Sequence, residues 1–299
     1  MSEHSNKPRK PRSPAKSTAQ NSSAKPSHKP AKNPLQKPWL KSGGQRPTSS
    51  GTRPAKPKTD ESKVYGDNAC RVLFQQRPES IIRLYLNADM AAKFSDVMKY
   101  LAQQKKAYHI VEDQELEKIA ASAHHGGVVL LVKRKPIQSL ASYLQQQKGK
   151  TDCLLALDGV GNPHNLGAIS RSCAHFGVSG VIMQQPELLQ SGAALRTAEG
   201  GGEFVAGLSS DSLALSLQLC KQAGYTLLTT SSHNGASLYQ TKLPAKVVVV
   251  FGEEMFGVSK NVAKTADIAL QIPGSGKVES LNVSVAASLI IGEWYRQQQ

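Results

Sequence analysis

Residues 153–171 read CLLALDGVGNPHNLGAISR, an unbroken apolar run followed by a glycine-rich turn and the start of an amphipathic helix. A short apolar run without alternation is typical of a strand that is buried on both faces, as in a parallel sheet. Similar runs follow at residues 180–183, 225–230, 247–251 and 268–272, and helical stretches occur at about 166–176, 187–199, 211–223, 258–265 and 281–298. This alternation predicts an α/β fold with a doubly wound parallel sheet for residues 151–299.

Ligands of such sheets bind beyond the carboxyl ends of the strands, where this chain has three unusual segments. They are residues 158–171, 252–257 and 273–284, whose glycines permit positive φ and a close approach of the backbone to a ligand. The GSGK sequence at 274–277 is not a P-loop, because Gln271 and Val278 stand where that motif needs Gly and Ser or Thr. No GxGxxG motif opens a helix after a strand, so a dinucleotide-dependent enzyme has no support in the sequence.

Two further regions precede this domain. Residues 61–133 alternate short helices with short strands, a pattern that predicts a small layered α/β domain. Residues 134–150 are mostly polar and predict a linker with room for one short helix.

The first 60 residues form a distinct basic segment. They carry 14 basic and two acidic residues, a net charge of +12, and leave only +3 for the remainder of the chain. They also hold ten of the sixteen prolines, with Trp39 as their single aromatic residue. Such a segment cannot bury enough apolar surface to offset its ordering entropy, so we predict a disordered tail. Its charge favours attraction to nucleic-acid phosphates, and the alternative is a solubilising tail without a partner.

The cysteines and the apolar runs limit the compartment and the class of protein. Cys70, Cys153, Cys173 and Cys220 are widely spaced and show no metal-ligand spacing, so we predict free thiols and no metal site. No apolar run approaches the roughly 18–20 residues of a membrane helix, and the first residues lack the apolar stretch of a secretory signal. We therefore expect a cytoplasmic protein without a membrane segment.

Three motifs, taken in order, resemble a known family. Asn165–Arg171, Gly252–Gly257 and Ile272–Ala286 are similar to the motifs of the SpoU-type (TrmH-like) RNA 2′-O-ribose methyltransferases of the SPOUT class. Val64–Ala69 and His125–Val132 look like the L30e-like substrate-binding domain of that family, so the resemblance covers about residues 64–299. Residues 162–167, 171–177 and 196–201 are most similar to its YfiF-like branch.

The resemblance implies a fold and an activity that composition does not reveal. It implies that a deep trefoil knot closes the C-terminal sheet and that the knotted loops hold S-adenosylmethionine largely through main-chain groups. Carried over to this sequence, Gly252, Ile272 and Leu281 are the expected cofactor contacts. The reaction would be methylation of a ribose 2′-hydroxyl in rRNA or tRNA. The final helix would pack in a homodimer whose subunits share the active site.

The catalytic residues implied by the resemblance are Arg171, Glu254, Asn282, Asn165 and Ser280. Arg171 would hold a phosphate and stabilise the developing oxyanion, since a guanidinium group that stays protonated is a poor base. Glu254 would orient Arg171 or Asn165, or accept a proton. Asn282, Ser280 and Asn165 each have a second interpretation as helix caps, and Arg171 has one as an ordinary surface arginine.

One departure from the family pattern leaves a second function open. Met255 stands where the family usually has Gly, and its side chain would line or crowd the cofactor loop. The alternative to an enzyme is therefore a non-catalytic RNA-binding protein that retains the methyltransferase fold.

Overall fold

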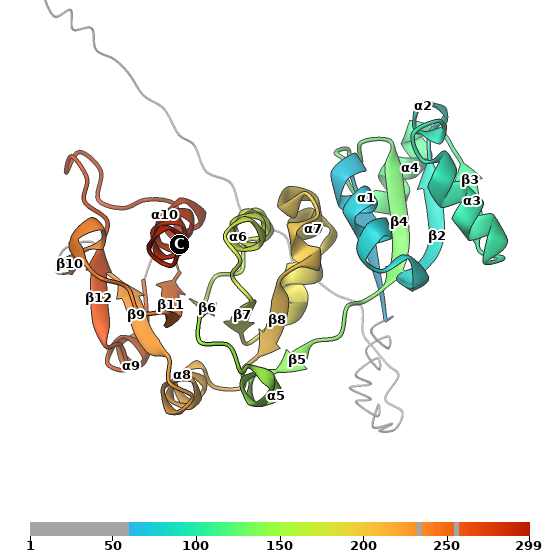
Figure 1. Cartoon of the computed structure of the whole chain (residues 1–299). Coiled ribbons are helices and arrows are strands. Elements are labelled where there is room, and N and C mark those ends of the chain that lie inside the picture. Colours follow the sequence, from blue (N-terminus) through green and yellow to red (C-terminus); the bar gives the residue numbers. More distant parts are fainter. Residues whose placement is uncertain (1–59, 232–234, 254–256) are drawn as a thin grey trace, which may run out of the picture. The chain divides into compact units, whose positions relative to one another are not determined.

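A computed structural model describes residues 60–231, 235–253 and 257–299 of the chain (Figure 1). The predicted tail therefore lies outside the described residues, apart from Asp60. The described residues form two sheets, which belong to one compact unit.

The smaller sheet has four strands, and the predicted α/β pattern of residues 61–133 is present in it. In spatial order the four strands are β1 (Glu61–Tyr65), β4 (Val128–Lys133), β2 (Ile81–Leu86) and β3 (Ala107–Ile110). β4 is antiparallel to both of its neighbours, and β3 runs parallel to β2. Its helices are α1 (Asp67–Gln76), α2 (Ala88–Ala91), α3 (Ser95–Gln103) and α4 (Asp113–Ala120).

The larger sheet has eight parallel strands, which confirms the predicted parallel α/β architecture. In spatial order they are β10 (Ala236–Ser237), β12 (Ile268–Gln271), β9 (Thr226–Thr230), β11 (Lys246–Gly252), β6 (Asp152–Asp158), β7 (Gly180–Met183), β8 (Ala206–Ser209) and β5 (Gln138–Ser139). The five predicted strands are all present. The other three have two to four residues each and carry no apolar run.

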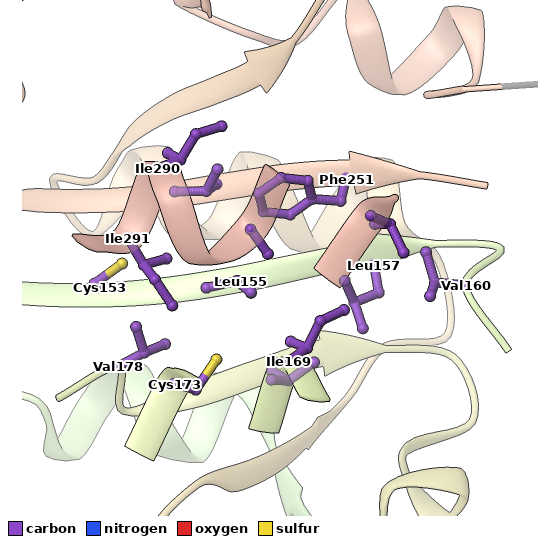
Figure 2. Packing of buried hydrophobic residues seen from close by; sticks show 14 of the residues in the cluster. Cys153, Leu155, Leu157, Val160, Ile169, Cys173, Val178, Phe251, Ile290 and Ile291 are labelled. Atoms are coloured by element: carbon purple, nitrogen blue, oxygen red, sulfur yellow. The ribbon is translucent and has the colours of Figure 1, made fainter. Parts of the chain in front are cut away.

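Helices cover both faces of the larger sheet (Figure 1). On one face lie α6 (Pro163–His175), α7 (Gly192–Ala198) and α10 (Val283–Gln297), and on the other α5 (Leu140–Gln146), α8 (Leu213–Gln222) and α9 (Lys260–Ala263). Successive side chains of a strand point to opposite faces, so β6 contributes to two cores. Leu155 and Leu157 pack with Ile169 and Ile290 on the first face (Figure 2), whereas Leu154 packs on the second.

The segment expected as a linker takes part in the larger sheet. β5 pairs with β8 in parallel, and Leu140 at the start of α5 is buried in the core with Leu154 and Leu208. The short helix is therefore present, and an edge strand precedes it.

Candidate functional site

The carboxyl ends of β6 and β11 lie side by side, because Gly252 pairs with Asp158 in the parallel register. Beyond them the chain turns back on itself. The Gly257 amide donates to the Glu253 carbonyl over 2.8 Å, and the Ser259 amide donates to Asp158 Oδ2 over 2.8 Å. The segments 158–171 and 252–257 therefore meet at this edge of the sheet.

Gly252 lies where two stretches of backbone come closest. A Cβ atom at this position would overlap main-chain atoms of Gly257 and Val258. Only glycine allows this approach, because any side chain would force the two stretches apart. The edge of the sheet at Gly252 is thus formed by main-chain groups.

Asn165 and Asn282, from the first and third motifs, are hydrogen-bonded to each other. Asn282 Nδ2 donates to Asn165 Oδ1 over 3.1 Å, although the two residues are 117 positions apart. Asn282 is also the cap of α10, since its Oδ1 accepts from the Ser284 amide over 2.9 Å. Asn282 is therefore a helix cap, as one of its two interpretations predicted, and it also contacts the first motif.

The structure corrects the interpretation of Asn165 as a helix cap. α6 begins at Pro163, and the cap is Asn162, whose side chain accepts from the His164 amide over 2.9 Å. The helix starts earlier than predicted because proline suits the first helical position, where its missing N–H is not needed. Asn165 lies inside the first turn, with its side chain directed to Asn282.

Arg171 lies on α6 with an exposed side chain. Its backbone is in close contact with the segment that follows α7, since a Cβ at Gly201 would lie 2.9 Å from Arg171 Cα. Gly167, in the same motif, brings α7 against α6. A Cβ there would lie 2.5 Å from the Ala194 carbonyl oxygen and from Thr197 Cβ. The glycine of the first motif thus has a packing role.

Glu199, which the sequence analysis did not single out, lies within the electrostatic reach of Arg171. Partial burial opposes ionisation of its carboxyl group. Hydrogen bonds from Asn68 and Arg196, together with the charges of Arg196 and Arg171, nevertheless hold its pKa below the ordinary value. Glu199 thus places a negative charge within electrostatic range of the predicted catalytic arginine, while its direct partners are Asn68 and Arg196.

Glu199 and its neighbour Arg196 each have a hydrogen-bond partner in the smaller sheet region, so the site extends toward it. Asn68 Nδ2, from α1, donates to Glu199 Oε2 over 2.8 Å, and Arg196 Nε donates to the His124 carbonyl over 3.4 Å. The spacing of Arg196 and Glu199 on one helix is visible in the sequence, but the position of Asn68, 131 residues away, has no sequence signal.

A nearly buried ion pair joins the same regions. Arg77 Nε lies 2.7 Å from Glu203 Oε2, and the two side chains are 15% and 5% exposed. A second hydrogen bond, from Arg77 NH2 to Glu203 Oε1 over 3.1 Å, makes the contact bidentate. Such pairs fix relative orientation, because both groups must keep the planar fork geometry.

The remaining predicted residues have different outcomes. Ile272 follows β12 and is partly buried against the core, whereas Leu281 is 44% exposed. Ser280 is exposed, and the structure records no hydrogen bond from it to another described residue. Glu254 and Met255 lie outside the described residues.

Within residues 60–231, 235–253 and 257–299, no group of three or more His, Cys, Asp or Glu side chains is arranged to hold a metal ion. No helix in the same part of the chain is long and apolar enough to cross a bilayer. All four cysteines are free and buried.

Comparison with protein families gives two adjacent matches. Residues 152–292 match the model of the SpoU rRNA methylase family. Residues 63–138 match a model described as RNA 2′-O ribose methyltransferase substrate binding. The boundary between the two matches falls in the segment that contains β5 and α5.

Three relatives show the extent of the similarity. The chain is 45% identical over 242 residues to "Uncharacterized tRNA/rRNA methyltransferase YfiF" of Escherichia coli, covering 81% of this chain and 70% of that protein. It is 38% identical over 243 residues to a tRNA/rRNA methyltransferase of Haemophilus influenzae, also called uncharacterized, covering 80% and 68%. It is 32% identical over 244 residues to the 23S rRNA (guanosine-2′-O-)-methyltransferase RlmB of Shewanella oneidensis, covering 79% and 97%.

Solved structures share the fold at lower sequence identity. A crystal structure described as an RNA 2′-O ribose methyltransferase superposes with a TM-score of 0.68 at 22% identity, covering 80% of this chain and 89% of that one. An AdoMet-bound rRNA methyltransferase from Sinorhizobium meliloti gives a TM-score of 0.65 at 19% identity, covering 81% and 89%. Both sheets of the present chain therefore have counterparts in known structures.

Proposed function

Because the chain belongs to the SpoU family of RNA methyltransferases, we propose that it transfers a methyl group from S-adenosylmethionine to a ribose 2′-hydroxyl of rRNA or tRNA. The observation that carries this proposal is the hydrogen bond between Asn282 and Asn165. It joins the first and third motifs at the edge of the sheet where the second motif also begins. The three segments are therefore held together, as a site built from them requires.

The residues at this edge fit the proposed cofactor. Bound S-adenosylmethionine supplies an electrophilic methyl group. Gly252 lets the backbone of Gly257 and Val258 close against the end of β11, so main-chain groups of both stretches form this edge, as recognition through the backbone requires. Ile272 would add an apolar contact, and Leu281 would contribute its main chain or its exposed side chain. The AdoMet-bound relative with the same fold supports the same assignment.

Arg171 is the residue proposed to act on the substrate RNA. Guanidinium groups are planar cations that bind phosphates, so Arg171 binds a phosphate and stabilises negative charge that develops on the ribose 2′-oxygen. Glu199 would restrict the orientation of this side chain through its own charge. Asn165 and Asn282 would hold the first turns of α6 and α10 in place around the reacting groups. Glu254 and Ser280 remain proposed contacts to the substrate or to Arg171.

The architecture proposed for the whole chain follows the family. It comprises a basic tail over residues 1–60, an L30e-like RNA-binding domain over 61–133, a connecting segment over 134–150 and a knotted methyltransferase domain over 151–299. Exposed apolar side chains on α10, among them Val285 and Leu289, support a homodimer built on that helix. We expect the protein to act in the cytoplasm, where rRNA and tRNA are modified.

Substitution of Arg171 tests the catalytic proposal. Transfer of a labelled methyl group to cellular RNA should fall at least about 100-fold in Arg171→Ala, which is the usual effect of removing one donor to a developing oxyanion. Arg171→Lys should recover only part of the rate, because an ammonium group cannot bind a phosphate in bidentate fashion. Lys242→Ala removes an exposed cation elsewhere and serves as the control. Wild-type transfer by Arg171→Ala would refute the assignment.

Calorimetry with S-adenosylmethionine separates the enzyme from the non-catalytic alternative. The enzyme must bind the cofactor, whereas an RNA-binding protein whose cofactor loop is blocked by Met255 need not. Absence of cofactor binding in a protein that still binds RNA would favour the alternative. Restoration of binding by Met255→Gly would then identify that side chain as the cause.

A further inference from the structure

One face of the smaller sheet is only partly covered by a helix. α4 packs Leu116 and Ala120 over Tyr65 and Val129, with Tyr85 partly buried at the margin of this cluster. Tyr65, Val129 and Tyr85 are direct neighbours across β1, β4 and β2. The helix therefore covers the row of side chains at one end of the face.

The next rows of the same face are exposed and basic. Lys63 and Arg83 both pair with Leu131, from opposite sides of β4, and Lys133 follows two residues further along that strand. All three cationic side chains are exposed. The residues that alternate with them, such as Val64, Leu84 and Val132, are buried in the core on the other face. The three cations must therefore share the uncovered face.

The face itself carries three cations and one acid. Glu61 lies opposite Lys133 on the same face and is its one acidic member. Lys106 adds a further cation nearby: burial and the charge of Lys133 lower its pKa, and its ammonium group donates to the Glu79 carbonyl over 2.8 Å. Arg134 follows Lys133 directly and donates from Nε to the Glu61 carbonyl over 3.1 Å. Glu79 and the acidic residues of α4 also lie at the border, so the excess of positive charge is confined to the face itself.

An aromatic stack borders these cations. The rings of Tyr85 and His109 are stacked with their centroids 5.4 Å apart and an interplanar angle of 20°. Arg83 lies over the same tyrosine, with Cζ 5.9 Å from the ring centroid, and donates from NH1 to its hydroxyl group over 3.0 Å. His109 is exposed and belongs to β3, the edge strand of the sheet. The stack thus ends in an exposed ring.

We propose that this surface, which we call the basic sheet face (Lys63, Arg83, Lys133, Tyr85 and His109), binds a single-stranded segment of the substrate RNA. The cations contact successive phosphates, and an unpaired base stacks on His109. The combination of an exposed aromatic ring, an arginine and lysines is what single-stranded RNA recognition uses, whereas duplex RNA is recognised mainly by its shape across the grooves. The inference rests on the proposed function, in that RNA is taken to be the substrate.

The location of the face suits a substrate that also reaches Arg171. β1, which carries Lys63, is the strand in contact with α7: a Cβ at Gly192 would lie 3.3 Å from the Lys63 carbonyl oxygen. Ser62 Oγ also donates to the Gln190 carbonyl over 2.8 Å, just before α7. α7 in turn packs on α6, which carries Arg171. An RNA strand on this face therefore passes beside the helix pair that bears the catalytic arginine.

Charge reversal in the full-length chain tests the phosphate contacts. Arg83→Glu with Lys133→Glu should weaken binding of a labelled single-stranded RNA of roughly 20 nucleotides at least about tenfold. It should also reduce the slope of log K against log salt by about 1.4, or 0.7 for each lost phosphate contact. Lys99→Glu with Lys242→Glu makes the same number of reversals at exposed lysines outside the face. Equal losses of affinity and slope in the two double variants would overturn the proposal.

The stacking contact has its own test. His109→Ala should weaken binding of the same single-stranded RNA about tenfold, whereas His109→Phe should retain most of the affinity because it keeps an aromatic ring. A blunt RNA duplex of equal length should compete poorly. Single-strand stacking would be refuted if the duplex competed as well as the single strand. It would also be refuted if the Ala and Phe variants bound RNA equally and both far more weakly than the wild type.

Cofactor binding and methyl transfer separate this inference from the proposed function. If the wild type transfers methyl groups and the Arg83→Glu, Lys133→Glu variant keeps its KM for RNA, the basic sheet face is not the substrate surface and the function stands. The opposite outcome is a wild type that neither binds S-adenosylmethionine nor transfers methyl groups, together with a double variant that no longer binds RNA. It would refute the proposed function and support the basic sheet face as an RNA-binding surface.

Discussion

Strand β6 begins at Asp152 and ends at Asp158, and the two aspartates have opposite surroundings. Asp152 is 3% exposed, and its carboxylate accepts hydrogen bonds from Ser179 Oγ over 2.5 Å, from Tyr143 over 2.8 Å and from Tyr225. Asp158 is only half-buried and accepts from the backbone of Ser259. One end of the sheet satisfies its polar groups internally, and the other presents them next to glycine-rich loops.

The difference shows how a parallel sheet separates stability from chemistry. At the amino end, burial raises the pKa of Tyr143 to about 12, so its hydroxyl stays protonated and donates to Asp152 throughout the neutral range. A satisfied buried network holds α5, β7 and β9 in fixed positions. The carboxyl end can then carry exposed loops, because the strands that support them are anchored elsewhere.

α10 connects the two ends. It begins at Asn282, which contacts Asn165 at the carboxyl end. Near its last turn, Trp294 Nε1 donates to the Pro244 carbonyl over 3.1 Å, just before β11 starts. Changes along this helix should therefore affect function at one end and stability alone at the other.

The largest expected effect is that of Gly252→Ala at the carboxyl end. The added methyl group would overlap the backbone of Gly257 and Val258, so we expect a loss of at least about 3 kcal/mol in the free energy of unfolding, measured with urea, and no cofactor binding. Gly161→Ala is the control at the same end, because its methyl group would meet no atom within 4 Å. A wild-type urea midpoint for Gly252→Ala would contradict the close approach.

Asp152→Ala should have the next largest effect, on stability alone. It leaves three hydroxyl groups without their acceptor, which should cost about 2–3 kcal/mol of unfolding free energy. Calorimetry should show unchanged affinity for S-adenosylmethionine, since the network lies at the opposite end of the sheet. A large change in cofactor affinity would mean that the two ends are coupled.

Asn282→Ala distinguishes helix capping from a role in the site. Loss of the cap should cost about 1 kcal/mol, and Asn162→Ala, which removes the cap of α6, should cost about the same. Only Asn282→Ala also removes the bond to Asn165, so only this variant should lower methyl transfer beyond what its stability explains. Equal rates of methyl transfer in the two variants would show that Asn282 acts only as a helix cap.

The smallest effect concerns the pH dependence of stability at the end of α10. Hydrogen bonds from Arg296 and Gln297 lower the pKa of Glu293 to about 2, from an ordinary value near 4.5. The ionised carboxylate therefore stabilises the fold above pH 4.5, and this contribution disappears as the pH falls toward 2.

A comparison with Glu293→Gln isolates this group. The difference in melting temperature between wild type and variant should shrink as the pH falls through this window. The underlying contribution should not exceed about 1 kcal/mol, because Arg296 is 69% exposed and its pair with Glu293 is screened by solvent. A pH-independent difference would rule out protonation of Glu293 as the cause.

Local patterns in the sequence account for much of the fold. The apolar run Cys153–Leu157 and the four others predicted strands because a strand buried on both faces needs no alternation. β5, β8 and β10 escaped prediction because two to four residues give too little pattern, and these strands exist through pairing with neighbours far along the chain. The start of α6 was misplaced because Asn162 and Asn165 are equally suitable caps by residue type.

Hydrophobic periodicity, charge and short motifs are local properties, so the parallel α/β domain, the basic segment and the three motifs of the SpoU family can be inferred from the sequence. Which distant groups meet follows only from the folded chain. Asn282 reaches Asn165, Asn68 reaches Glu199, and the backbone at Gly252 packs directly against that at Gly257. Such contacts depend on strand order and on the packing of α7 against α6, and neither is encoded within any one stretch of the chain.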